Sequence, residues 1–214
     1  GPERSESWEG GLRLLSDNTT LSFAAFKADY DDFISQQVVA GSFTPSDPAI
    51  YRFVNFDRVK IEGLEAKVSY HSNNGTYGRF AIAYADGKII SPDAEPRPLD
   101  TIDPLNLVAG VGYRQPDGRF GAELIMTHHA RKELEETVDV CAAACFRPDA
   151  FTILDATAFV SVTEALKLRA GLFNLTDQKY AYWQDVRGLS ADTDIADAFS
   201  RPGRNASVSL SYRF

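Results

Sequence analysis

Hydrophobic and polar residues alternate along most of the chain. The clearest stretch is residues 205–214, where apolar Ala, Val, Leu, Tyr and Phe take the even positions and Asn, Ser and Arg take the odd ones. Because successive side chains of a β-strand point to opposite faces, this pattern predicts a strand with one apolar and one polar face. The same pattern recurs in residues 64–70, 107–113, 120–127 and 166–172, and no stretch predicts an amphipathic helix.

The alternation and the turn-forming residues together predict nine strands. All ten Pro residues fall outside the strands, as expected because proline has no N–H to donate to a neighbouring strand. The predicted strands lie near residues 5–16, 20–38, 51–71, 76–90, 105–115, 118–133, 151–162, 165–174 and 203–214.

The connections between the predicted strands fall into two alternating sets. The short set, with Asn-Gly and Asp-Gly pairs that tolerate tight hairpins, comprises residues 17–19, 73–75, 116–118 and 163–164. The long, polar set comprises residues 39–50, 91–104, 134–150 and 175–202. Short periplasmic turns alternating with long extracellular loops are typical of an antiparallel transmembrane β-barrel. A soluble β-sandwich also gives strands with a period of two, but its loops usually vary less regularly.

Composition agrees with this all-β interpretation. The 214 residues are 44% hydrophobic, which allows a large core or a membrane-facing surface. With 30 acidic and 22 basic residues the chain carries a net charge of -8, which argues against a nucleic-acid-binding protein. No stretch approaches the roughly 18 apolar residues of a membrane-spanning helix. The first residues, Gly1 and Pro2, follow neither a Met nor an apolar leader, so we expect a removed signal peptide or an internal fragment.

The odd number of predicted strands separates those two options. Nine antiparallel strands place the first and last side by side in parallel, and bacterial single-chain barrels have even strand counts. An open sheet edge in lipid leaves backbone groups unpaired at a cost of several kcal/mol each. We therefore expect residues 1–214 to be the C-terminal part of a larger barrel domain, with the other strands upstream.

Several motifs resemble the TonB-dependent outer-membrane receptors. Residues 201–214 are similar to the closing strand of that family, in which the barrel-assembly machinery reads the terminal aromatic residues, here Tyr212 and Phe214. Residues 171–180 resemble the family's N-L-T-D-x-x-Y segment, and residues 2–13 resemble the strand that follows its Asn-Pro-x-Leu motif. Residues 59–65 and 98–113 resemble the haem and haemoglobin receptors of this family.

The resemblance implies that the complete protein is a 22-stranded barrel in the outer membrane of a Gram-negative bacterium. It would contain a plug domain and a TonB box, both absent here, and would take up haem or iron from a haem protein with energy from the TonB complex. Haem would be cargo, with no covalently bound cofactor and no enzymatic activity, and the haem-ligating region would precede Gly1. A siderophore or other nutrient receptor of the same fold, and a soluble β-sandwich or adhesin module, are the alternatives.

The three His residues are candidate haem ligands, because neutral imidazole is a common axial ligand. His71 precedes a short turn, so we expect it to be structural. His129 should point into the barrel near the outer rim and His128 outward, by strand alternation. We take His129 as the candidate ligand, although an interface or lumen-lining role explains it more simply. Three aromatic residues of the last long loop are further candidates, for which loop packing is at least as good an explanation: Tyr180, Tyr182 and Trp183.

Cys141 and Cys145 lie in a long loop of a surface protein, so we favour a disulfide over a zinc site, which needs more thiolates or histidines. We expect no metal site, and we interpret the acidic clusters as solvated charge at strand ends. Charged residues in the polar phase of the strands should line the lumen: Arg13, Glu65, Lys67, Arg79, Glu123, Lys167, Arg169 and Arg213. Aromatic residues expected at the membrane interfaces or in loop contacts are Trp8, Tyr70, Tyr84, Tyr113, Tyr180, Tyr182, Trp183, Tyr212 and Phe214.

Overall fold

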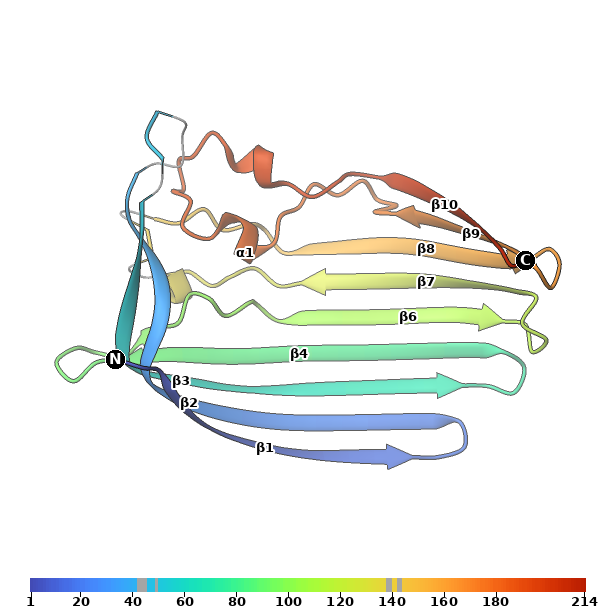
Figure 1. Cartoon of the computed structure of the whole chain (residues 1–214), viewed down its shortest axis with the longest axis horizontal. Coiled ribbons are helices and arrows are strands. Elements are labelled where there is room, and N and C mark those ends of the chain that lie inside the picture. Colours follow the sequence, from blue (N-terminus) through green and yellow to red (C-terminus); the bar gives the residue numbers. More distant parts are fainter. Residues whose placement is uncertain (42–45, 49, 138–139, 142–143) are drawn as a thin grey trace.

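The chain forms one antiparallel β-sheet with almost no helix (Figure 1). The structure, a computed structural model, describes residues 1–41, 46–48, 50–137, 140–141 and 144–214. The long strands that follow each other along the chain are neighbours in the sheet. One short strand within a loop, residues 97–98, pairs with the strand before it. The predicted all-β antiparallel fold is therefore confirmed.

Nine long strands lie close to the predicted positions. They are β1 (Arg4–Leu15), β2 (Thr19–Ala40), β3 (Ile50–His71), β4 (Thr76–Ile90), β6 (Asn106–Arg114), β7 (Phe120–His129), β8 (Phe151–Ser161), β9 (Leu166–Phe173) and β10 (Asn205–Tyr212). The short strand β5 (Arg97–Pro98), which the sequence did not predict, pairs with the end of β4 beyond the start of β6. The helical segments are η1 (Glu135–Thr137), α1 (Trp183–Val186) and η2 (Ala196–Phe199). None of the helices in the described part of the chain is long and apolar enough to cross a membrane.

The prediction for β7 was too long. It extended to residue 133, whereas the strand ends at His129. His129 lies opposite Asn106, the first residue of β6, and opposite Phe151, the first residue of β8. Both neighbours begin at this level. Beyond His129 the N–H of Ala130 still donates to the carbonyl oxygen of Leu105 at 2.9 Å, and the chain then turns into the loop.

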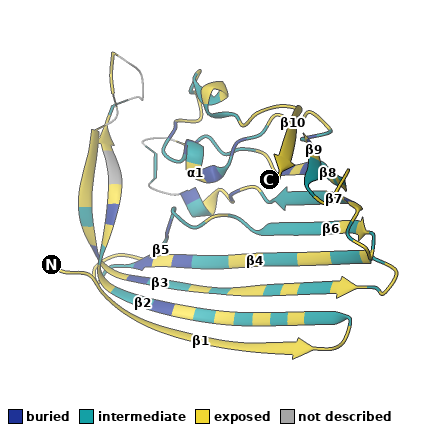
Figure 2. Ribbon diagram, turned by 45° about the vertical axis from the view of Figure 1, so that its right-hand side comes forward, coloured by how far each residue is buried: buried dark blue, intermediate teal, exposed yellow. Residues whose placement is uncertain are grey.

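The sheet is open, with β1 and β10 at its two edges. In the described part of the chain, β1 pairs only with β2 and β10 only with β9. The two edge strands point in the same direction (Figure 1) and are exposed along their whole length (Figure 2). They could not close an antiparallel sheet on each other, as the strand count predicted.

Short and long connections lie at opposite ends of the sheet (Figure 1). Gly75 and Gly118 provide the positive φ angles of two short turns, 94° and 73°, which side chains with a Cβ adopt only with strain. The predicted long loops lie at the other end, where the N-terminus also lies, and the C-terminus lies at the turn end. Residues 42–45 and 49 of the first predicted loop lie outside the described residues.

One face of the sheet is apolar across the middle of the strands. Val111 lies opposite Leu124, Leu124 opposite Ala156, and Ala156 opposite Leu172. Directly opposed residues share a face, so these side chains form a row across four strands. Val111, Leu124 and Leu172 remain 56%, 45% and 51% exposed. This face is the one that we expect to contact lipid.

The opposite, inner face carries polar groups and close-fitting aromatic rings. Arg79 donates to Glu123 at 2.6 Å across β4 and β7. The ring of Tyr77 lies over Gly112, where an added Cβ would come within 2.4 Å of it. Glycine at this position therefore lets a large ring lie flat along the wall, and any other residue would displace the ring.

The polar and apolar faces exchange near the loop end of β2, β3 and β4. Lys27, Glu62 and Asp86 lie side by side in the outer phase, just beyond the apolar band. In the inner phase, Val59 and Ile89 are 0% and 3% exposed. These strands therefore continue out of the apolar band into a region where the outside is polar and the inside has a hydrophobic core.

That hydrophobic core is closed by the second long loop. Leu99 packs with Phe56, Val59 and Ile89, and its N–H donates to the carbonyl oxygen of Gly87 at 2.7 Å. β5 holds the loop alongside β4 at the same level. Buried residues accordingly gather at the loop end of the sheet (Figure 2).

A charge placed on the outer face should destabilise the sheet in its membrane. Leu124 occupies the middle outward-facing position of β7, and arginine near a bilayer midplane costs about 2–4 kcal/mol. We expect Leu124→Arg in the intact protein to lower the urea midpoint of unfolding in lipid vesicles. Thr157→Arg, on the inner face of the adjacent strand, is the matched control and should have a much smaller effect. Equal effects would contradict the assignment of the two faces.

Candidate functional site

The described residues of three long loops pack together at one end of the sheet. We call residues 91–105, 130–150 and 174–204, as far as they are described, the loop cap. Ala181, Val186 and Leu189 form its small hydrophobic core, with Phe146, Ile195 and Phe199 packed around them. The cap is therefore a folded unit that brings distant segments together.

Three of the four predicted ligand residues meet in one aromatic cluster. His129 stacks on Phe151 with ring centroids 5.0 Å apart and meets the ring of Tyr182 edge-on at 4.8 Å. Tyr180 lies 4.6 Å from Phe151 and 5.8 Å from Tyr182. β7 and β8 position His129 and Phe151 opposite each other, and the last loop lays the two tyrosines over them.

This cluster is packed closely and leaves little free volume. The cavity lined by His129, Phe151, Tyr182 and Trp183 measures about 10 Å³, room for roughly one water molecule. Burial, together with neighbouring Tyr182 and Asp155, raises the pKa of Tyr180 above its ordinary value. Tyr180 is therefore held as the neutral phenol. It can contact a ligand through its ring face, and it is not poised to act as a phenolate.

An ion pair covers the outer side of the cluster. The guanidinium of Arg201 lies 5.1 Å from the centre of the Tyr182 ring. It also donates two hydrogen bonds to the carboxylate of Asp185, at 2.9 and 2.7 Å. This two-pronged pair fixes the Tyr182 ring between Arg201 and His129.

Trp183, the fourth predicted ligand residue, instead fastens two loops together. It is 4% exposed, and its indole N–H donates to the carbonyl oxygen of Asp100 at 2.6 Å. Arg187 contacts the Asp100 carboxylate at 2.8 Å, and Gln184 donates to the carbonyl oxygen of Thr101. α1 and the residues beside it therefore hold the last loop against the second one.

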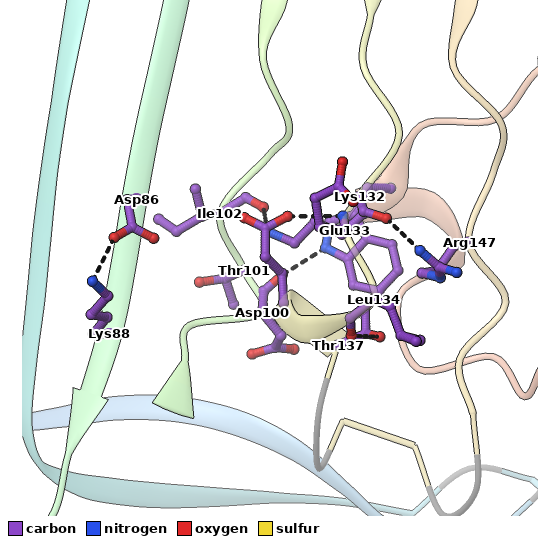
Figure 3. A network of polar contacts seen from close by, with 12 residues as sticks. Asp86, Lys88, Asp100, Thr101, Ile102, Lys132, Glu133, Leu134, Thr137 and Arg147 are labelled. Carbon is purple, nitrogen blue, oxygen red and sulfur yellow. Dashed lines mark hydrogen bonds and ion pairs between the residues drawn. The ribbon is translucent and has the colours of Figure 1, made fainter. Parts of the chain in front are cut away.

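Lys132 is a buried cation at the centre of the loop cap (Figure 3). Its ammonium donates to the carbonyl oxygen of Ile102 at 2.7 Å and lies 3.5 Å from the Glu136 carboxylate. Its own carbonyl oxygen accepts a hydrogen bond from Arg147 at 3.0 Å. Because its side chain is only 1% exposed, these bonds replace the water that the charge would otherwise need.

Cys141 and Cys145 are joined by a disulfide, with Cα atoms 5.3 Å apart. Cys145 pairs with Ser190 in an isolated β-bridge, and the N–H of Phe146 donates to the carbonyl oxygen of Leu189 at 2.8 Å. The disulfide thus lies where the third loop contacts the last one. Residues 138–139 and 142–143 of this loop lie outside the described residues.

Asn174, from the predicted N-L-T-D segment, closes the base of the last loop. It is 2% exposed and adopts a positive φ of 51°. Its side-chain amide donates to the carbonyl oxygens of Gln178 and Pro202, and its side-chain oxygen accepts from the Gln178 N–H. This segment therefore joins the two ends of the loop, which is a structural role that a motif alone does not reveal.

The other histidines lie apart from the aromatic cluster. His71 stacks on Tyr77 near a short turn, 5.8 Å between ring centroids. His128 lies in the outward phase of β7, and its ring is hydrogen-bonded to the hydroxyl of Thr152 at 2.9 Å. Within the described ranges no group of three or more His, Cys, Asp or Glu side chains is placed to hold a metal ion.

Sequence reasoning missed Lys132 and Asp100, on which the cap depends. A single lysine in a polar loop resembles any solvated charge, because its burial depends on contacts 30 residues away along the chain. Asp100 likewise meets its partner Arg187 across 87 residues. No local signal distinguishes either residue from exposed neighbours.

The open antiparallel sheet, with an apolar outer face, short turns and folded long loops, defines part of an outer-membrane β-barrel receptor. The chain belongs to the TonB-dependent receptor family, since its residues 1–175 match the family described as TonB dependent receptor-like, beta-barrel. Membership in this family places the sheet in the outer membrane of a Gram-negative bacterium.

Curated relatives align with nearly all of the chain. The hemoglobin and hemoglobin-haptoglobin-binding protein of Haemophilus ducreyi is 25% identical over 99% of the chain and 26% of its own length. Hemoglobin-binding protein A of Haemophilus influenzae is 28% identical over 100% of the chain and 24% of its length. Transferrin-binding protein A of Neisseria meningitidis serogroup B is 26% identical over 100% of the chain and 27% of its own length. The chain spans about a quarter of the length of these relatives.

Solved structures share the fold. The copper transporter OprC superposes with a TM-score of 0.80 at 23% identity, covering 100% of this chain and 32% of that one. A mutant of the ferric enterobactin receptor of Pseudomonas aeruginosa superposes with a TM-score of 0.68 at 18% identity, covering 99% and 31%. These relatives and solved structures are named as binding proteins, a transporter and a receptor.

Removing the buried charge of Lys132 should loosen the loop cap. In Lys132→Met the carbonyl oxygen of Ile102 loses its donor, a cost of about 1–3 kcal/mol for a buried polar group. We expect hydrogen exchange of backbone amides in residues 91–105 of the intact receptor to rise at least about fivefold. Lys179→Met, which removes an exposed ion pair with Asp197, should leave that exchange unchanged. Equal exchange in both variants would show that Lys132 does not hold the cap.

The two cysteines should be oxidised in the protein isolated from membranes. We expect mass spectrometry of the non-reduced, alkylated receptor to find residues 141 and 145 linked within one chain, because a surface loop faces an oxidising compartment. Reduction before alkylation provides the control, in which both thiols become labelled. Two labelled thiols without reduction would contradict the disulfide.

Proposed function

We propose that the complete receptor takes up haem, or iron from a haem protein, across the outer membrane with energy from the TonB complex. The observation that carries the proposal is the alignment of nearly the whole chain with curated proteins named for binding haemoglobin. The protein acts in this proposal as a receptor and not as an enzyme, with haem as cargo rather than as a resident cofactor.

In this proposal residues 1–214 are the C-terminal part of the barrel domain, and further strands complete the barrel. Support comes from the two sheet edges, since unpaired N–H and C=O groups in lipid cost several kcal/mol each. The parallel directions of β1 and β10 support it as well, because they prevent direct closure (Figure 1). The TonB complex and an interior domain would act through parts of the protein beyond this sheet.

The aromatic cluster at the loop end is the proposed place of first contact with the cargo. A flat porphyrin is well matched by ring faces, and the rings of His129 and Tyr180 each lie within 6 Å of the Tyr182 ring. The cluster is closed in the structure, so cargo would have to displace Tyr182 and the Arg201–Asp185 pair. Trp183 contributes by holding the loop rather than by contact with cargo.

Uptake of a smaller iron complex, such as a ferric siderophore, is the second candidate. The alignment with the Haemophilus ducreyi protein runs over 253 positions although this chain has 214 residues, so the relative carries additional residues within the same span. Fewer residues over the same span offer less surface to a host protein, and this observation favours a small ligand over a protein ligand.

Growth on defined iron sources should distinguish these functions. A strain that lacks its own receptors and carries the intact gene should grow on haem as the sole iron source, and should not grow if TonB is also deleted. Parallel cultures with haemoglobin and with a ferric siderophore test the other two ligands. Growth on the siderophore with no growth on haem would contradict the haem assignment and support the second candidate.

A further inference from the structure

Three cations gather on the inner face of the sheet at the turn end, far from the loop cap. Arg114 lies opposite Gly121, Gly121 opposite Phe159, and Phe159 opposite Arg169. Opposed residues share a face, so this row presents two arginines on either side of one aromatic ring. Lys167 lies two residues before Arg169 on the same strand and hence on the same face.

The Phe159 ring is the platform between these cations. The ring lies over Gly121, where an added Cβ would come within 2.7 Å of it. The Arg114 guanidinium lies 5.6 Å and the Lys167 ammonium 4.0 Å from the ring centre. Arg169 is oriented by a 3.0 Å hydrogen bond to the Ser211 hydroxyl on β10. The three charges are thus positioned by neutral partners.

No carboxylate forms an ion pair with these three cations within the described part of the chain, although the Glu123 carboxylate lines the same hollow as Arg114 and Arg169. Among the ion pairs of the described residues, all within 4.0 Å, Arg79 pairs with Glu123 on the same wall. None of these ion pairs involves Arg114, Lys167 or Arg169. An adjoining hollow of about 350 Å³ is lined by Tyr77, Arg114, Glu123, Phe159, Arg169 and Phe173, among other residues. A basic wall beside a hollow occurs here in a chain whose net charge is -8.

We propose that Arg114, Lys167 and Arg169 form an anion site, which receives the carboxylates of the cargo as it leaves toward the periplasm. The proposal rests on the proposed uptake function and extends it to a second place in the barrel. Arginine forks match carboxylates in two-point geometry, and Lys167 adds a mobile third charge. The ring of Phe159 lies among the charges, so the site suits carboxylates carried on a flat, apolar ring system such as haem. An acidic surface of the receptor's interior domain is the competing occupant.

The experiment uses the intact receptor in cells, with haem as the probe. In the variant with Arg114→Gln, Lys167→Gln and Arg169→Gln, we expect haem uptake to fall at least about tenfold, because several charge-assisted hydrogen bonds are lost. Haem binding to the cell surface should be unchanged, since the loop cap is untouched. The variant with Arg114→Lys and Arg169→Lys keeps the charges but loses the forked geometry, so its uptake should lie between that of the glutamine variant and that of the unaltered receptor. Barrel assembly of each variant is checked by heat-modifiable mobility on gels.

The matched control removes three cations from the outer face. Lys27→Gln, Lys60→Gln and Lys88→Gln should leave both surface binding and uptake unchanged. Normal uptake by the inner-face variant would overturn the anion site alone. Loss of surface binding by the inner-face variant would also overturn it. A gain in vancomycin sensitivity would show that the barrel has become leaky, and would overturn it in favour of contact between these cations and the interior domain. Absence of haem uptake by the unaltered receptor would overturn the proposed function and the anion site with it.

Discussion

Backbone hydrogen bonding in a medium without water is the constraint on which the whole structure depends. Each strand must pair along its length with neighbours, since an unpaired N–H or C=O in lipid costs several kcal/mol. Long strands from β1 to β10 satisfy this requirement across the apolar band except at the two edges, and the register shift between β2 and β3, at Val38 and Ala40, lies beyond that band at the loop end. The alternation of apolar and polar residues follows, because a fully paired sheet between lipid and lumen leaves only the side chains free to differ.

The same backbone serves two surroundings. In the apolar band the outer face is apolar and the inner face is polar. Beyond Leu64 and Tyr84, toward the loop end, the outer face becomes polar and the inner face apolar. There the outside carries charges such as Lys88 and Asp86, which pair at 3.2 Å, while the inside buries Val59 and Ile89. The same strands therefore continue from the apolar band into a region whose outer surface is polar, and the loop cap packs against the inner side of that region.

The inner face is specialised at its two ends. At the loop end, rings and buried hydrogen bonds fill the space, and Lys132 and Trp183 tie the loops into one unit. At the turn end the wall is open and basic, with cations set around Phe159. The two ends of the inner face therefore differ both in packing and in charge.

The sequence by itself determined the nine long strands, their order, the alternation of short and long connections, and the two faces. Each of these depends on neighbours in the chain or on a period of two, so local pattern is sufficient. The tertiary structure alone decided that β7 stops at His129, that Trp183 fastens loops, and that Lys132 is buried. Those outcomes depend on partners many residues away, such as Asp100 for Arg187, and no local pattern encodes which distant loop will supply the partner.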